Sequence, residues 1–309
     1  MNTKRKKNPY NARKEIMLFN YDYQRPKVVA EIGCNHMGEI EIAKELIVLA
    51  KECGADVAKF QTRDNKLLLT EEQYNAPHPT RENAYGNTYG AHREHLEFNR
   101  EQHIELKAYC ETSGIEYSTS VWEINSAKMI FELKPSFIKV PSACNNNFEM
   151  LKVLRDDYQG NVQISFGMTT RAEAEKVIKF FEENDNAKER LTIYSCTSGY
   201  PVPFKDVALL EINNLYEKYG DRVKEIGFSG HHLGIAIDNA AYTLGARWIE
   251  RHFTKDRTWR GTDHAASLEP DGLRKLVRNL NACYSALTYK ISEILEIERV
   301  QRDKLKYKK

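Results

Sequence analysis

The chain has 309 residues, of which 41% are apolar and 29% are charged, and its formal net charge at neutral pH is +2. This composition is typical of a folded globular protein with a large core, and so small a net charge excludes the strongly basic field of a nucleic-acid-binding domain. No run of residues approaches the roughly 18 apolar positions of a membrane-spanning helix, and no signal peptide opens the chain, so we expect a cytoplasmic protein without nucleic-acid or membrane partners.

Residues 1–26 contain few apolar side chains and a basic cluster, Lys4-Arg5-Lys6-Lys7. This pattern is typical of a solvated N-terminal extension. The six cysteines form no C-x-x-C pair, which argues against a zinc knuckle or a thioredoxin-type motif. We expect them to be reduced, mostly buried thiols.

From residue 27 onward, short apolar runs alternate with amphipathic helical stretches. Each run is continuously apolar, as parallel strands covered on both faces are. The predicted strands are Lys27–Gly33, Ala55–Phe60, Ile115–Ser120, Phe137–Pro141, Val162–Gly167, Leu191–Cys196, Glu225–Ser229 and Arg247–Phe253. Eight strand–helix units without a G-x-G-x-x-G motif after the first strand favour a (β/α)8 TIM barrel over an open sheet, so we predict a single α/β domain over residues 27–290.

Two segments depart from this alternation. Residues 62–98, after the second strand, are rich in proline, glycine, histidine and tyrosine and are predicted to form a long loop. Loops of this length in compact domains are commonly functional, and this one would lie at the mouth of the barrel. Residues 291–309 are predicted to form a charged helix or tail.

Polar residues follow every predicted strand, and in a barrel these strand ends meet at one mouth. Two of them are lysines, Lys59 and Lys139, and several are hydroxyl residues: Thr119, Ser142 and Ser165. Ammonium groups and hydroxyls together suit an anion that combines a carboxylate with a phosphate.

Two histidines, His231 and His252, follow the seventh and eighth strands. Neighbouring strands could place both imidazoles on one divalent ion, leaving coordination positions for water and a substrate oxygen. A pair of hydrogen-bonded core histidines is the alternative. We favour the metal site because both residues stand at strand ends.

Several motifs resemble the sialic acid synthase family. They are Ala30-Glu31-Ile32-Gly33-Cys34-Asn35-His36, Lys59-Phe60-Gln61, Ser195-Cys196-Thr197-Ser198-Gly199-Tyr200-Pro201, Gly227-Phe228-Ser229-Gly230-His231 and Glu250-Arg251-His252-Phe253-Thr254. Residues 258–270 are similar to the animal branch in particular. The resemblance runs in order from residue 28 to about residue 285.

The resemblance implies a phosphoenolpyruvate-dependent, C–C bond-forming transferase. Its substrates would be phosphoenolpyruvate and an amino-sugar aldehyde, N-acetylmannosamine or its 6-phosphate, and its products N-acetylneuraminic acid and phosphate. Mn²⁺ or Mg²⁺ on His231 and His252 would polarise the aldehyde. Carbon 3 of phosphoenolpyruvate would attack the aldehyde carbon, water would add at carbon 2, and the tetrahedral intermediate would lose phosphate by C–O cleavage.

The resemblance also implies residue roles. Positions that would hold the donor or the intermediate are Lys59, Thr119, Lys139, Ser142, Ser165, Ser198, Tyr200 and Ser229. Positions near the sugar are Glu31, Gln61 and Asp263, where Glu31 would hold hydroxyls or shuttle a proton. The predicted catalytic residues are therefore Glu31, Lys59, Lys139, His231 and His252.

The sequence departs from the family pattern in two main ways. Cys144 stands two places after Ser142, where the family has an acidic residue, although a shifted alignment over Asn145-Asn146-Asn147 would blur this comparison. Family members also have a C-terminal antifreeze-like domain that supplies an arginine to the partner subunit's sugar. No such segment is present in the sequence, so we expect either a separate antifreeze-like protein or a different sugar pocket. Members of the family pair as dimers, which makes a homodimer the expected assembly.

Three other interpretations stay open. A sister enzyme with the same donor and another sugar aldehyde would be a legionaminate, pseudaminate or deoxynonulosonate synthase. An aldolase forming a Schiff base through Lys139 would be trapped by borohydride with pyruvate and would need no metal. A catalytically silent barrel would bind a sugar or act as a scaffold without releasing phosphate.

Overall fold

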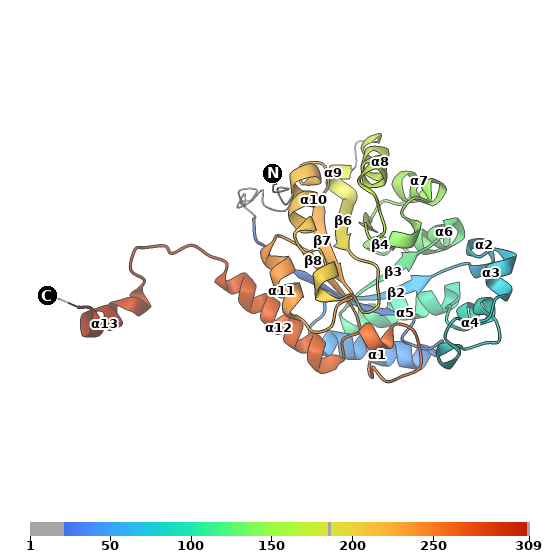
Figure 1. Ribbon diagram of the computed structural model, residues 1–309, viewed down its shortest axis with the longest axis horizontal. Coiled ribbons are helices and arrows are strands. Elements are labelled where there is room, and N and C mark those ends of the chain that lie inside the picture. The colour runs from blue at the N-terminus through green and yellow to red at the C-terminus, as the bar shows by residue number, and fades with distance from the viewer. Residues whose placement is uncertain (1–21, 185–186, 308–309) are drawn as a thin grey trace, which may run out of the picture.

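The fold is a closed barrel of eight parallel strands, in the order β1 to β8, surrounded by helices (Figure 1). The computed structural model describes residues 22–184 and 187–307, so the Lys4–Lys7 cluster and most of the predicted extension over residues 1–26 lie outside the described residues. The TIM-barrel prediction is confirmed. The strands are β1 Lys27–Gly33, β2 Val57–Thr62, β3 Glu116–Val121, β4 Phe137–Val140, β5 Asn161–Ser165, β6 Leu191–Cys196, β7 Glu225–Gly230 and β8 Trp248–His252.

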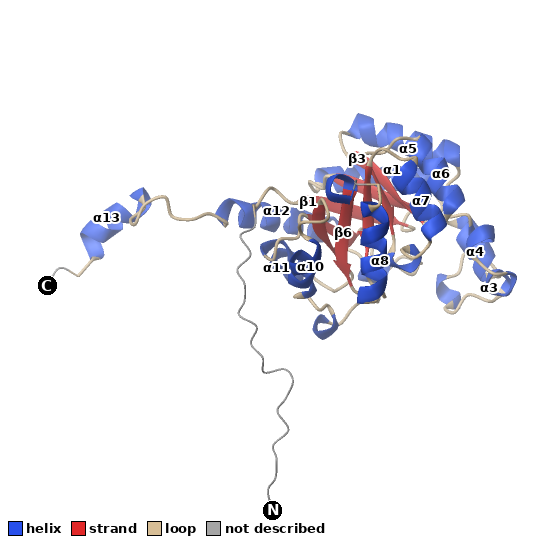
Figure 2. Cartoon of the chain, turned by 90° about the horizontal axis from the view of Figure 1, so that it is seen from above, coloured by secondary structure: helices blue, strands red, loops and turns tan. Residues whose placement is uncertain are grey.

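Helices follow the strands and cover the outside of the barrel (Figure 2). The longer ones are α1 Ile40–Glu52, α5 Arg100–Ser113, α6 Ile124–Glu132, α7 Phe148–Asp156, α8 Arg171–Glu182, α10 Glu211–Tyr219, α11 Ala236–Thr243 and α12 Pro270–Ala286. The shorter ones are α2 Asn65–Leu68, α3 Glu71–Asn75, η2 Arg81–Asn83, α4 Tyr89–His95, η3 Ser142–Cys144, α9 Ala187–Arg190, η4 Phe204–Asp206 and η5 His264–Ala266, with α13 Glu296–Leu305 near the C-terminus.

Apolar side chains close one end of the barrel interior. Val29, Val57 and Phe137 form a small buried cluster there, against which the partly buried Trp248 packs. The rings of Phe137 and Trp248 meet edge to face, with their centroids 5.3 Å apart. These residues lie at or near the starts of their strands, so the opposite, C-terminal end of the interior is left for polar groups.

The segment over residues 62–98 is not one long loop, and that prediction is wrong in this respect. It contains the short helices α2, α3, η2 and α4, of which α2, α3 and α4 begin at side-chain caps. Thr70 and Gln73 form a capping box at α3, and Thr88 caps α4. Helices this short leave little periodic signal in the sequence.

This segment is fastened to the connection between β8 and α12. The Tyr85 hydroxyl donates to the carbonyl of Arg260 at 2.5 Å, and the Gly261 amide donates to the Asn83 side chain at 3.3 Å. The Arg260 guanidinium also lies over the Tyr85 ring. Two connections that are far apart in sequence therefore meet at the mouth of the barrel.

Near the C-terminus, α13 lies away from the barrel beyond an extended connection from α12 (Figures 1 and 2). Its apolar residues Ile297, Val300 and Leu305 are exposed. None of the helices that the structure describes is both long and apolar enough to cross a membrane. All six cysteines are free, and four of them are buried.

A buried ion pair links β8 to α11. Arg251 on β8 and Asp238 on α11 are 1% and 0% exposed, and their nearest side-chain atoms are 2.6 Å apart. Arg251 also donates to the carbonyls of His232 and Gly234. A charge held this deeply depends on its partner, because water cannot replace it.

We expect Asp238→Ala to lower the free energy of unfolding by about 3–5 kcal/mol, because Arg251 would stay buried without its carboxylate. Urea denaturation followed by circular dichroism measures the change. The control is Asp271→Ala, which removes an exposed carboxylate 2.7 Å from Lys275 and should leave the midpoint unchanged. Equal midpoints for both variants would contradict the role given to the buried pair.

Candidate active site

Charged side chains lie directly above the apolar end of the barrel interior. In a strand, residues two apart share a face, so the positions after Val29, Val57, Phe137 and Trp248 on the inner face belong to Glu31, Lys59, Lys139 and Glu250. Each apolar residue of the closed end is thus followed on its own strand by a charged one. The two-residue period of the strands therefore places a ring of charged side chains next to the apolar residues of the closed end.

These four residues form a charge cluster of two ammonium groups and two carboxylates. Lys139 Nζ lies 2.9 Å from Glu250, and Lys59 Nζ lies 3.7 Å from the same carboxylate. Lys59 also pairs with Glu31, its lateral neighbour on β1, and donates to the Ser120 hydroxyl at 2.8 Å. Both lysines are at most 2% exposed, so their charges depend on these partners.

The cluster determines the protonation of its members. Burial acts to raise the pKa of Glu250, but the two lysines outweigh it and hold the pKa well below the usual value. Burial acts to lower the pKa of Lys59, and Glu250 and Glu31 more than offset it, so that pKa is raised. Lys139 has a lowered pKa because of burial, which Glu250 only partly opposes.

Hydroxyl groups line the other side of the same cavity, which has a volume of about 340 Å³. Of the predicted residues, the cavity is lined by Glu31, Lys59, Lys139, Ser142, Ser165, Ser198, Tyr200, Ser229, His231 and His252. Gly167 sits behind the hydroxyls, and a Cβ there would lie 2.5 Å from Ser198 Oγ and 2.8 Å from Ser142 Oγ. Only glycine therefore leaves room for these two hydroxyls, and its backbone amide donates to Ser142 Oγ at 2.9 Å.

His231 and His252 lie together at the rim, with ring centroids 5.4 Å apart. His231 Nδ1 lies 3.0 Å from the carbonyl of Thr197, which fixes that nitrogen as the donor and leaves Nε2 with its lone pair. Burial, and then His252, lower the pKa of His231 to about 4, so it is neutral at pH 7. His252 Nδ1 is buried without a hydrogen-bond partner among the described residues.

These features fit two imidazoles that share a divalent ion. Within residues 22–184 and 187–307, no three His, Cys, Asp or Glu side chains are grouped so that they could hold a metal by themselves. An ion on His231 and His252 would therefore take its remaining ligands from water or substrate.

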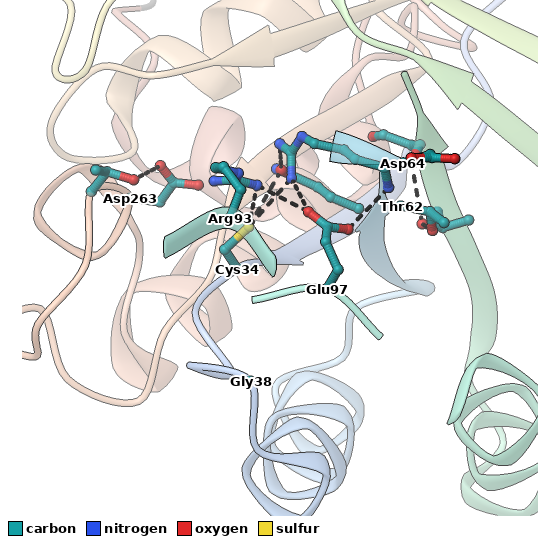
Figure 3. Close-up of polar contacts among 12 residues, drawn as sticks. Cys34, Gly38, Thr62, Asp64, Arg93, Glu97 and Asp263 are labelled. Carbon is teal, nitrogen blue, oxygen red and sulfur yellow. Dashed lines mark hydrogen bonds and ion pairs between the residues drawn. The ribbon is translucent and has the colours of Figure 1, made fainter. Parts of the chain in front are cut away.

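Two further predicted residues extend the site toward β1 and the β8–α12 connection. Gln61 donates to Glu31 at 2.8 Å, and Asp263 Oδ2 lies 3.6 Å from His252 Nδ1. Burial acts to raise the pKa of Asp263, but His252, the Thr262 hydroxyl, Arg93 and Arg63 together lower it, so Asp263 is a carboxylate at neutral pH. Figure 3 shows Asp263 beside Arg93.

The structure does not bring Thr119 or Cys144 to the cavity. The Thr119 hydroxyl lies 2.8 Å from Thr62, which in turn contacts His103 of α5, so this face of β3 points to the helices. Its neighbour Ser120 lines the cavity instead. Cys144 is buried in η3, and burial raises the pKa of its thiol to about 12, so it brings no charge to the site.

The sequence analysis missed Glu250 as a functional candidate. The signal was available, because Glu250 precedes His252 by two positions on β8 and must share its face. Ser118 on β3 pairs with the inward-facing Lys59 on β2. Ser120 lies two positions further along β3, so it could have been predicted to face inward in the same way.

Comparisons with known proteins identify the family of this chain. Residues 46–292 match the model of the NeuB family. N-acetylneuraminate-9-phosphate synthase of Homo sapiens is 38% identical over 279 residues, covering 90% of this chain and 76% of that protein. N,N'-diacetyllegionaminic acid synthase of Campylobacter jejuni is 31% identical, covering 84% of this chain and 77% of that protein.

A solved structure extends the likeness to the fold. The crystal structure of N-acetylneuraminic acid synthetase from Leptospira borgpetersenii superimposes with a TM-score of 0.75 at 26% identity, covering 92% of this chain and 94% of that one. Family match, relatives and barrel together show that this chain belongs to the NeuB family of sialic acid synthase-like proteins.

Proposed function

We propose that the protein condenses phosphoenolpyruvate with an amino-sugar aldehyde, N-acetylmannosamine or its 6-phosphate, to give the N-acetylneuraminate product and phosphate. One observation supports this most: Lys59, Lys139, His231 and His252 line a single cavity at the C-terminal end of the barrel. Barrel enzymes hold their catalytic residues at this end of the strands.

The donor binds against the two lysines and the hydroxyls of Ser142, Ser165, Ser198 and Ser229. Lys59 and Lys139 direct N–H groups at the phosphate and carboxylate, while the hydroxyls donate to the remaining oxygens. Positive charge at the phosphate also improves it as a leaving group. Tyr200, whose ring lies 4.3 Å from that of His231 by centroids, covers the rim beside the reacting carbons.

Carbon 3 of phosphoenolpyruvate forms the new bond to the aldehyde carbon, and water adds at carbon 2. The resulting tetrahedral intermediate expels phosphate by C–O cleavage, which leaves the 2-keto acid. Glu31 accepts hydrogen bonds from sugar hydroxyls or moves a proton, held in place by Gln61 and Lys59. Asp263 accepts hydrogen bonds from the sugar on the other side of the rim.

The charge balance of the site favours a divalent cation. The charge cluster is neutral as a group, and Asp263 adds a negative charge, so a multiply charged donor meets no excess of positive charge there. His231 and His252 are the residues that would hold Mn²⁺ or Mg²⁺. When bound, the ion would act as a Lewis acid on the aldehyde oxygen.

The choice of acceptor is supported by the relatives. Proteins named N-acetylneuraminate-9-phosphate synthase in Homo sapiens and Drosophila melanogaster are 38% and 37% identical to this chain. The second candidate is the aldehyde precursor of legionaminate, because N,N'-diacetyllegionaminic acid synthases are 31% and 30% identical.

The proposed reaction is tested with the purified full chain, phosphoenolpyruvate and Mn²⁺. We expect phosphate release that depends on N-acetylmannosamine or its 6-phosphate, with formation of the corresponding nonulosonic acid detected by mass spectrometry. A higher kcat/KM with the legionaminate precursor would move the assignment to the second candidate. No phosphate release with any aldehyde would support a silent barrel instead.

We expect His252→Ala to reduce kcat roughly a thousandfold, because the loss of Lewis-acid assistance raises the barrier by several kcal/mol. Electron paramagnetic resonance of Mn²⁺ should show weaker binding in the same variant, and circular dichroism should show an unchanged fold. Near-normal turnover by the unsubstituted protein in metal-stripped buffer would refute the metal assignment.

A further inference from the structure

Two buried arginines meet beside the cavity and form what we call the arginine pair, Arg63 and Arg93. Arg63 follows β2, and Arg93 lies on α4, in the segment between β2 and α5. Arg63 Nη1 and Arg93 Nη2 approach the same Glu97 oxygen, at 3.0 Å and 3.2 Å (Figure 3). Both also donate to Cys34 Sγ, at 3.7 Å and 3.4 Å.

The pair has more N–H groups than its hydrogen-bond partners accept. The side chains of Arg63 and Arg93 are 7% and 10% exposed, yet they share the single carboxylate of Glu97. A thiol sulfur is only a weak hydrogen-bond acceptor. Among the described residues, Arg93 Nε and Nη1 have no hydrogen-bond partner. Two guanidinium groups so placed suit a second anion, because their planar N–H donors match phosphate oxygens.

The pair is connected to the active site on both sides. Arg63 donates to Gln61, which bonds to Glu31 of the charge cluster. Arg93 lies beside Asp263, which is 3.6 Å from His252. The arginine pair thus stands on the side of β1, β2 and β8, whereas Ser142, Ser165, Ser198 and Ser229 occupy the side of β4 to β7.

A tryptophan that lines the cavity orients Arg63. The Arg63 guanidinium lies 3.9 Å from the centre of the Trp122 ring, a cation–π stack that fixes its plane. Trp122 lines the cavity itself, and its Nε1 is buried without a partner among the described residues. An anion beside the pair would therefore find preorganised donors, which reduces the entropy lost on binding.

We propose that Arg63 and Arg93 bind the phosphate of an acceptor sugar that is phosphorylated at the carbon farthest from its aldehyde. This inference rests on the proposed function, since it names the acceptor that the same site takes. With the aldehyde near His231 and His252, the sugar chain passes Asp263, which accepts hydrogen bonds from its hydroxyls. The terminal phosphate then reaches the arginine pair, while the donor phosphate stays with the lysines.

The test compares kcat/KM for N-acetylmannosamine 6-phosphate and for N-acetylmannosamine on the same enzyme preparation. The protein itself should prefer the phosphorylated sugar. Arg93→Gln and Arg63→Gln should each reduce the ratio of the two values by about 10- to 100-fold, the effect of losing one charge-assisted hydrogen-bond donor group. Partial unfolding lowers both values together, so it cannot produce this change in the ratio.

Two further variants sharpen the result. Arg93→Lys keeps the charge and should retain more of the ratio than Arg93→Gln. Arg222→Gln is the matched control, because Arg222 is likewise held by carboxylates, Glu175 and Glu182, but lies on the outside of the barrel. It should leave the ratio unchanged.

Equal losses for both sugars in the Arg63 and Arg93 variants would overturn the inference, because the pair would then only hold the segment in place. Preference of the unsubstituted protein for the unphosphorylated sugar would overturn it as well and leave the proposed function intact. Absence of phosphate release with either sugar would overturn the proposed function and this inference together.

Discussion

The rest of the site depends on Glu250, the carboxylate that two buried lysines share. Lys59 and Lys139 would repel each other in a dry barrel, and neither reaches water. Glu250 lies within 4 Å of both and accepts a further hydrogen bond from Ser229. Because these residues come from β2, β4, β7 and β8, the interactions that compensate their charges also fix the relative positions of four strands.

This arrangement explains how the proposed donor pocket can be stable before any substrate binds. With no anion present, each ammonium group already has a carboxylate partner, so the barrel avoids an uncompensated buried charge. A phosphate that binds here does not have to immobilise the two lysine side chains, because packing, Glu31 and Glu250 already hold them in place. The ring of Tyr194 lies 3.5 Å below Lys139 Nζ and limits its movement further.

Much of the fold could be predicted from the sequence because continuous apolar runs mark parallel strands so clearly. The observed strand ends lie within two residues of the predicted ones, and β1 and β6 coincide with them. The polar strand ends also identified most of the cavity lining. Thr119 was predicted at the cavity but does not line it, because a shift of one residue along β3 turns a side chain from the interior to the helices.

Other features depend on contacts between segments that the sequence does not relate. Arg63 and Arg93 meet only because the short helices after β2 fold back over the mouth, and no local pattern indicates that they share Glu97. The same holds for the contact between Tyr85 and Arg260.

The division between strands and connections also has an evolutionary consequence. The charge cluster belongs to strands whose neighbours form the core, so substitutions there disturb folding as well as chemistry. The arginine pair, Glu97 and Asp263 belong instead to the connections after β2 and β8. These connections contribute few side chains to that core. If the proposed function is correct, a lineage can exchange one sugar for another by altering these connections, while the strands that carry the charge cluster are inherited unchanged.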